Sequence, residues 1–158
     1  NICQGKTIME NDLSIIIDRT ALIENLLNQI ICNYTSPREG LMDFFWGVIL
    51  DSSVMNLGAK IKVVTVISKK LNCDINQNTL HDLIRIRNAF AHHELMSHPV
   101  YIVAKDPKND EMCYELQIIK SNGVIERKNR KDALEEFNKN YLIAKVDLVK
   151  LCDLTKQI

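Results

Sequence analysis

Apolar residues recur every three or four positions in several parts of the chain, which is the spacing of an amphipathic helix. The first such segment runs from Leu13 to Tyr34, and Asn11 or Asp12 can cap its start. Another helix is expected over about Asn56–Leu71, with one apolar face formed by Leu57, Ile61, Val64, Ile67 and Leu71. We expect the lysines of this segment to lie mostly away from that face: Lys60, Lys62, Lys69 and Lys70.

A further helix start is predicted between these two segments, at Ser36-Pro37-Arg38-Glu39. Serine is a common cap, proline suits the first turn, and glutamate stands three residues after the serine. The helix that follows is apolar nearly all round, with Phe44, Phe45, Trp46, Val48, Ile49 and Leu50. We therefore predict that it is buried and that Trp46 belongs to the core rather than to a base-stacking surface.

The polar stretch Asn72–Asn78 interrupts the helical pattern, and Thr79-Leu80-His81-Asp82 then resembles a capping box with aspartate in place of glutamate. It predicts a helix that carries Leu80, Leu83, Ile84, Arg87 and Ala91.

From Pro99 the pattern changes to the alternation of β-strands. Val100–Lys105 and Cys113–Ile119 alternate, and the polar residues Asp106–Asp110 between them predict a turn. Asn122-Gly123 is typical of a hairpin turn. We expect a small β-hairpin or meander at about 100–127, followed by a last helix that begins near Asn129 or Arg130.

These elements predict a mainly α fold, an antiparallel bundle of four to five helices with the β insertion before the last one. The length of 158 residues fits a single domain over 1–158. With 46% hydrophobic and 25% charged residues, a disordered chain is excluded. Twenty basic residues balance twenty acidic ones, so nucleic acid would have to contact a local patch or a dimer groove. No apolar run reaches the roughly 18 residues of a membrane span.

The five cysteines are spread along the chain without a C-x-x-C pair, so we expect no zinc site, no disulfide framework and a reducing cytoplasm. The first ten residues lack the layout of a signal peptide. Because no initiator Met is present, we expect a processed chain or an excised fragment. No Gly-rich phosphate loop is found, which excludes nucleotide hydrolysis of the P-loop type.

The segment from Arg85 to Glu94 carries most of the candidate chemistry. At about 100° per residue, Arg87 falls in the middle of the apolar face of its helix. An unpaired guanidinium buried there would lower the stability of the fold by roughly several kcal/mol. Arg87 therefore needs a carboxylate such as Glu94, helix carbonyls, a partner subunit or an anionic ligand. Asn88 and His92 stand four residues apart and can meet across one turn.

The sequence Arg87-Asn88-x-Phe90-Ala91-His92 resembles the R-x(4–6)-H signature of the HEPN superfamily. It looks most like the R-N-x-F-A-H-H form of the mannitol-operon-repressor-like and related uncharacterised branches. Leu57-Gly58-Ala59-Lys60-Ile61 also resembles the helix that precedes the motif in such proteins. The similarity covers roughly Leu13 to His93 and the closing helix, whereas the strands depart from the minimal all-α form.

The resemblance implies a metal-independent endoribonuclease of the defence or toxin type, with two motifs meeting across a homodimer. In that function Arg87 holds the scissile phosphate, His92 transfers protons, and Asn88 orients His92 or the phosphate. The products would carry a 2′,3′-cyclic phosphate and a 5′-hydroxyl. No cofactor and no metal are expected. His93, Arg127, Lys128 and Arg130 are candidate contacts to the RNA.

Each of these residues also has a simpler interpretation. Arg87 can pair with a core acid, and His92 and His93 suit a helix C-terminus, where a positive charge is favoured. The basic run 127–131 can be a solvated helix start. A metal site formed by His92, His93 and His98 lacks an acidic or cysteine partner at fixed spacing.

A second function class is therefore kept open. The chain could be a non-catalytic regulatory or protein-interaction module, such as a transcription regulator or an antitoxin-like partner. In that case Arg87 would stabilise the fold or the dimer, and no RNA would be cleaved.

Overall fold

The structure is a computed structural model that describes residues 2–93, 100–102, 111–113, 115–120 and 122–157. Side chains are described for 11–92, 115–120 and 122–157.

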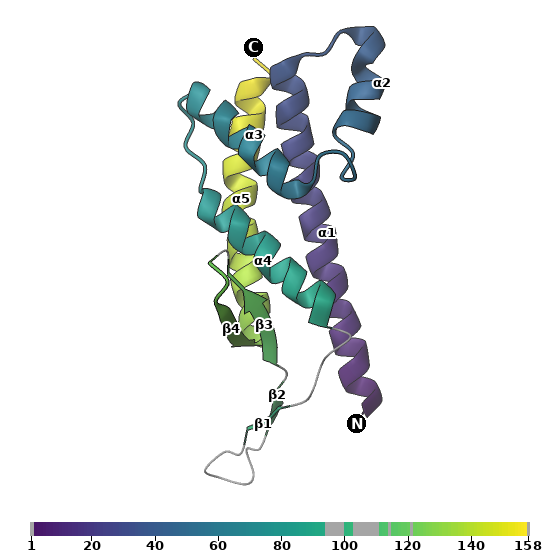
Figure 1. Ribbon diagram of the computed structural model, residues 1–158, viewed down its shortest axis with the longest axis vertical. Helices are drawn as coiled ribbons and strands as arrows, with labels where there is room; N and C mark the ends of the chain where they lie inside the picture. Colours follow the sequence, from purple (N-terminus) through teal and green to yellow (C-terminus); the bar gives the residue numbers. More distant parts are fainter. Residues whose placement is uncertain (1, 94–99, 103–110, 114, 121, 158) are drawn as a thin grey trace.

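Four long helices form the body of the molecule: α1 (Ile2–Thr35), α3 (Leu57–Lys70), α4 (Gln77–His93) and α5 (Arg130–Thr155). Helices α1 and α5 lie side by side, and α3 and α4 cross them on one face (Figure 1). The core between them includes Ile16, Leu27, Ile30, Val64, Ile86, Phe90, Phe137 and Leu148, all fully buried. The predicted mainly α fold is confirmed. In the part of the chain that is described, no helix is both long and apolar enough to cross a membrane.

Helices α1 and α5 run in the same direction, which differs from the expected antiparallel arrangement. Their contacts advance together along both helices, from Asp12–Arg130 through Arg19–Asn138 to Asn33–Thr155. The reason is topological. Helices α3 and α4 carry the chain back toward the beginning of α1, and α5 then starts from there (Figure 1).

The prediction of a buried helix after Ser36 is wrong. Ser36 ends α1 instead of opening a helix: it adopts a positive φ of 43°, and its amide donates to the Cys32 carbonyl at 2.9 Å. Three short turns follow, η1 (Glu39–Leu41), α2 (Met42–Phe44) and the π-helical η2 (Phe45–Ile49), and none contains a buried residue. They stand beside α1 (Figure 1), and Leu41, Phe44 and Trp46 are 55%, 56% and 39% exposed, so the prediction that Trp46 belongs to the core is wrong. Phe45 packs against the core, and Leu50, just after η2, is buried.

Asparagines cap three of the helices. The Asn56 side chain accepts from the Ala59 amide at 3.0 Å, and the Asn129 side chain accepts from the Lys131 amide at 2.8 Å, which confirms the predicted starts of α3 and α5. Helix α4 begins earlier than predicted. Asn76 accepts from the Thr79 amide at 3.2 Å and so takes the capping role that the sequence suggested for Thr79.

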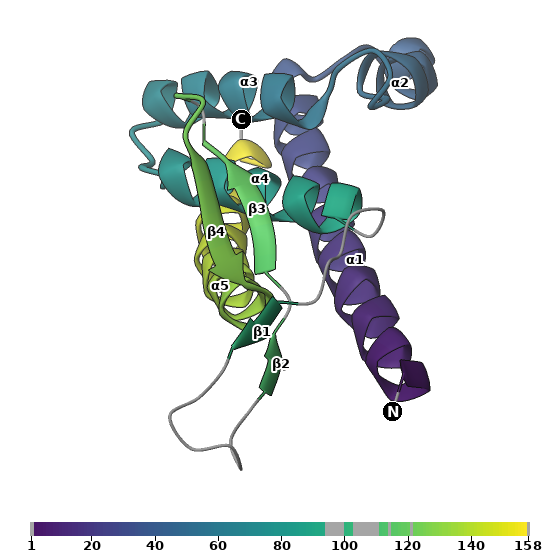
Figure 2. The same cartoon turned by 60° about the horizontal axis from the view of Figure 1, so that its bottom comes forward.

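The β insertion consists of two antiparallel pairs before α5. Strand β1 (Val100–Ile102) pairs with β2 (Glu111–Cys113), and β3 (Glu115–Ile119) pairs with β4 (Ile125–Asn129). Between β3 and β4 Gly123 has a φ of +80°, as the predicted Asn122-Gly123 turn requires. Leu116 and Ile118 of β3 are buried where the pair packs on α4 and α5 (Figure 2). The turn predicted over 106–110 lies outside the described residues.

An ion-pair network joins this β pair to α4 and α5. The Arg85 guanidinium of α4 contacts Asp82 at 3.0 Å, Glu126 of β4 at 3.1 Å and Glu136 of α5 at 3.6 Å. Lys120 contacts Glu126 at 3.3 Å. The network holds the sheet against the helix that carries the motif.

We expect Glu126→Gln to destabilise the protein more at about pH 7 than near pH 3. The hydrogen bond from Lys120 lowers the pKa of the Glu126 carboxyl, with smaller effects of Lys128 and Arg85. A lowered pKa contributes stability above the ordinary glutamate range, and this contribution is lost as the pH falls through the lowered value. Urea unfolding of both proteins at the two pH values measures it. An equal destabilisation at both would contradict the network's role.

Candidate functional site

The rotation of α4 about its axis decides how its motif is presented. Ile86 and Phe90 are fully buried and define the centre of the inner face. Arg87 follows Ile86 by about 100°, so it lies at the edge of that face and is half-buried. The predicted central position of Arg87 is wrong, because Ile86 shifts the centre of the buried face away from Arg87.

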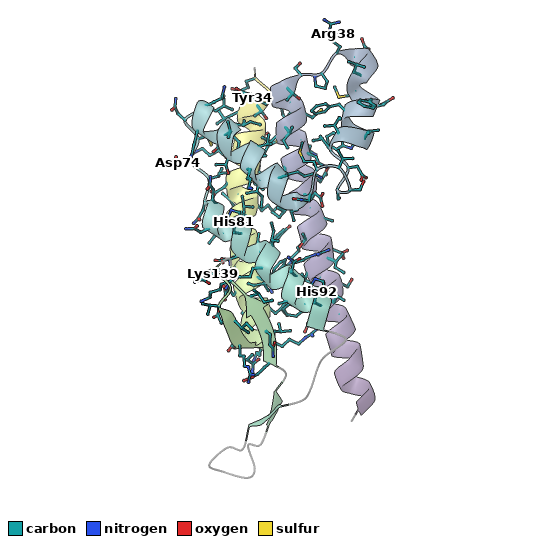
Figure 3. The ribbon with its side chains drawn as sticks, in the orientation of Figure 1. Tyr34, Arg38, Asp74, His81, His92 and Lys139 are labelled. Atoms are coloured by element: carbon teal, nitrogen blue, oxygen red, sulfur yellow. The ribbon has the colours of Figure 1, made fainter. Side chains whose placement is uncertain are left out.

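The three motif side chains occupy the last turns of α4. Arg87 Nη1 donates to Asn88 Oδ1 at 3.0 Å, and within the described part of the chain Arg87 forms no ion pair with a carboxylate. His92 is exposed at the C-terminal end of the helix (Figure 3). Glu94, which the sequence suggested as a partner of Arg87, lies outside the described residues. The end of α4 therefore presents a cation and an imidazole to solvent or to a partner.

The other candidate RNA contacts are differently engaged. Arg127 is exposed on β4, whereas Lys128 pairs with Glu136. Arg130 is 7% exposed, pairs with Asp12 at 3.2 Å, and holds its guanidinium 4.7 Å from the centre of the Phe90 ring. These contacts hold Arg130 inside the bundle. The His93 side chain and all of His98 lie outside the described residues.

Sequence reasoning missed a buried cation on α3. Lys60 is 0% exposed, and its Nζ lies 2.5 Å from Oε1 of Glu24 on α1. The expectation that Lys60 lies away from the apolar face is wrong, although Lys62, Lys69 and Lys70 are exposed. The signal was present in the spacing. Lys60 precedes Val64 by four residues and Ile67 by seven, so the three share one face.

The Lys60–Glu24 pair lies in an open groove of about 380 Å³ between α1, η2 and the start of α3. The groove is lined by Ala21, Glu24, Asn25, Asn28, Trp46, Gly47, Leu50, Asp51, Ser52 and Lys60. Ser52 and Asp51, which also line the groove, have partners as well. Ser52 donates to Glu24 Oε1 at 2.9 Å, and hydrogen bonds from Ser53 lower the pKa of the Asp51 carboxyl.

Among the described residues, a buried acceptor on a residue that lines the groove lacks a partner. Oδ1 of Asn28 is buried and accepts no hydrogen bond from the described residues. A buried acceptor of this kind is normally satisfied by water or a ligand. None of the residues that line the groove belongs to the motif of α4, so the two clusters are separate.

Comparison of the chain with protein-family models, curated proteins and solved structures gave no match. The likeness to the HEPN superfamily therefore rests on the motif residues and their spacing. Among the described residues, no group of three or more His, Cys, Asp or Glu side chains could hold a metal ion.

We expect Glu24→Ala to lower the free energy of unfolding by about 3–5 kcal/mol, because it leaves the buried Lys60 ammonium without its counter-charge. Ser52→Ala is the matched control, since it removes a hydrogen bond to the same carboxylate and keeps the ion pair. Its effect should be about 1 kcal/mol. Urea unfolding followed by circular dichroism measures both. Equal effects of the two substitutions would show that the ion pair is not the stabilising element.

Proposed function

We propose that the protein is a metal-independent endoribonuclease of the defence or toxin type that cleaves single-stranded RNA. The observation that supports this most is the end of α4. There Arg87 contacts Asn88 without a carboxylate partner among the described residues, and His92 is exposed in the next turn. A guanidinium without a carboxylate partner is available to a phosphate.

RNA supplies its own nucleophile for this reaction. The 2′-hydroxyl loses its proton and attacks phosphorus, and the bond from phosphorus to the 5′-oxygen breaks as that oxygen gains a proton. The products are a 2′,3′-cyclic phosphate and a 5′-hydroxyl. Arg87 stabilises the charge that develops on the phosphate oxygens, and His92 exchanges a proton. Asn88 orients Arg87 through their hydrogen bond.

The proposed active form is a homodimer that associates through α4. Cleavage needs one group to accept a proton and another to donate one. Within residues 85–92, whose side chains are all described, His92 is the single histidine. A second copy of α4 would supply another His92 imidazole to a shared site. Buried free thiols at Cys32, Cys73 and Cys152 suit the reducing cytoplasm in which we propose that the protein acts.

We expect Arg87→Ala and His92→Ala each to reduce RNA cleavage in EDTA by about 100-fold or more. His81→Ala is the matched control, because His81 is an exposed histidine of the same helix outside the motif (Figure 3). Gel analysis of a labelled single-stranded RNA measures the rate, and circular dichroism checks that each variant is folded. Full activity of both motif variants would contradict the proposal.

The second candidate is a non-catalytic regulatory or protein-interaction module. The segment 41–54 favours it, because Leu41, Phe44, Val48 and Val54 are all more than 40% exposed, and apolar patches of this kind mark interaction surfaces. This alternative predicts that the parent protein does not cut RNA and that Arg87→Ala mainly lowers the midpoint of unfolding or dissociates the dimer. Sedimentation together with the cleavage assay separates the two functions.

A further inference from the structure

Helix α5 carries an exposed apolar stripe on the side away from the core. Its inner face is fully buried at Phe137 and Leu148, whereas Leu142, Val146 and Val149 are 61%, 69% and 39% exposed. These three residues follow one another by four and three positions, so they form one continuous stripe along the helix. Val146 stands nine residues after Phe137, which places it about 180° from the inner face. Val146 therefore marks the centre of the stripe.

The exposed apolar surface continues from α5 onto α1. Arg19 of α1 donates to Asn138 of α5, and its guanidinium lies 5.0 Å from the centre of the Tyr141 ring. Leu22 follows Arg19 by three residues, and Leu142 follows Asn138 by four. Because the two helices run in parallel, both leucines lie at about the same level. Leu22 is 53% exposed and so widens the apolar surface beside the stripe.

The charges at the two ends of the stripe are arranged symmetrically about Val146. Lys139 precedes Val146 by seven residues and Asp153 follows it by seven, and both side chains are exposed. Seven residues span about two helical turns, or about 10 Å, so both charges lie on the same side of α5 as the stripe. Asp153 contacts Lys156 at 2.9 Å, an exposed pair that leaves the carboxylate accessible. The face thus has a cation at one end, an anion at the other and an apolar centre.

This pattern of charges is complementary to a reversed copy of itself. In a two-fold interface, a residue on the axis meets its own copy, and residues at equal distances on either side of the axis meet one another. With Val146 on the axis and two α5 helices antiparallel, Lys139 faces the partner's Asp153, and Asp153 faces the partner's Lys139. A parallel pair would instead bring like charges together. The charges therefore select the antiparallel arrangement.

Other partners match this face less well. A helix that lies on an anionic membrane carries lysine or arginine along its polar border, whereas the line of this stripe ends in Asp153 and includes the exposed Glu135 at the other end. Nucleic acid needs cations for its phosphates or aromatic rings for its bases, and the centre of the stripe is aliphatic. A second copy of the chain satisfies both the apolar centre and the charged ends.

We propose that two copies of the chain associate through these faces of α5, with the helices antiparallel and Val146 on the two-fold axis. Leu142, Val146 and Val149 form the centre of the interface, and one Lys139–Asp153 ion pair closes each end. This contact goes beyond the association through α4 proposed above, because none of the motif residues lies on α5. If both contacts form, they join the dimers into a larger assembly.

The first test is the mass of the assembly, measured by sedimentation of the full chain. Val146→Glu places two carboxylates against each other on the axis, so we expect it to weaken this contact by at least about 100-fold and to halve the mass. The side chain of Val146 is largely exposed, so the core stays intact. Val66→Glu is the matched control, because Val66 is a 54% exposed valine of α3, and it should leave the mass unchanged.

Charge reversal tests the orientation of the two helices. Lys139→Glu and Asp153→Lys each set like charges against one another at both ends of the interface, and we expect each to weaken association by about tenfold. The two substitutions combined restore opposite charges at both ends and should recover most of the parent's affinity. Circular dichroism checks that all three variants keep their helices, so that a loss of association is not a loss of fold.

Four results would overturn the proposal. The parent could sediment as a monomer, Val146→Glu could keep the parent's mass, or the combined reversal could associate as weakly as the single ones. A monomeric parent that sediments with phosphatidylserine vesicles, and no longer does so as Val146→Glu, would identify a membrane contact instead. None of these measurements involves RNA cleavage, so a failure of the ribonuclease proposal leaves them unaffected.

Discussion

The burial of Ile86 and Phe90 fixes how the rest of α4 is presented. Both side chains are fully buried, so the helix cannot rotate without exposing a large apolar area. Arg130 covers the Phe90 ring from α5, and the acids around Arg85 hold the helix from the side of the β insertion. With the rotation fixed, Arg87 must lie at the edge of the buried face, and His92 must lie at the open end of the helix.

Lys60 and Arg87 have different surroundings. Lys60 is fully buried and has a carboxylate within contact distance, as the cost of an isolated buried charge demands. Arg87 is half-buried and contacts an amide oxygen instead. A partly exposed guanidinium keeps part of its hydration and needs no counter-charge from the fold. This difference is consistent with the proposed phosphate contact at Arg87, whereas Lys60 has a structural role beside the groove.

Much of the fold follows from the sequence because local rules determine it. The spacing of apolar residues located the long helices, Asn56 and Asn129 marked the starts of α3 and α5, and Asn122-Gly123 marked the turn of the second β pair. The structure of the segment 36–49 could not be predicted from these local rules. Its composition resembles that of a core helix, but the structure forms three short turns there, and Leu41, Phe44 and Val48 are exposed while Phe45 packs against the core.

Of the two candidate sites, the sequence predicted the motif of α4 but not the groove around Lys60. The motif follows from the sequence because all of its residues lie on one helix. The predicted rotation of that helix differs from the structure, in which the buried Ile86 places Arg87 at the edge of the inner face instead of its centre. The groove combines Glu24 from α1, Trp46 from η2 and Lys60 from α3, and no sequence pattern states that these three meet. The spacing of Lys60 from Val64 and Ile67 places it on the buried face, contrary to the prediction, and its partner Glu24 is 36 residues away in sequence.

The most direct test of the proposed catalytic role of α4 is the position at which RNA binds. Nuclear magnetic resonance of the imidazole protons, recorded while an uncleavable 2′-deoxy substrate analogue is added, reports contact at each histidine. The account predicts that the His92 signals move in a saturable way, that those of His81 stay in place, and that Arg87→Ala abolishes the change. Saturable binding of the analogue with unmoved His92 signals would contradict it, because the strand would then bind elsewhere on the protein.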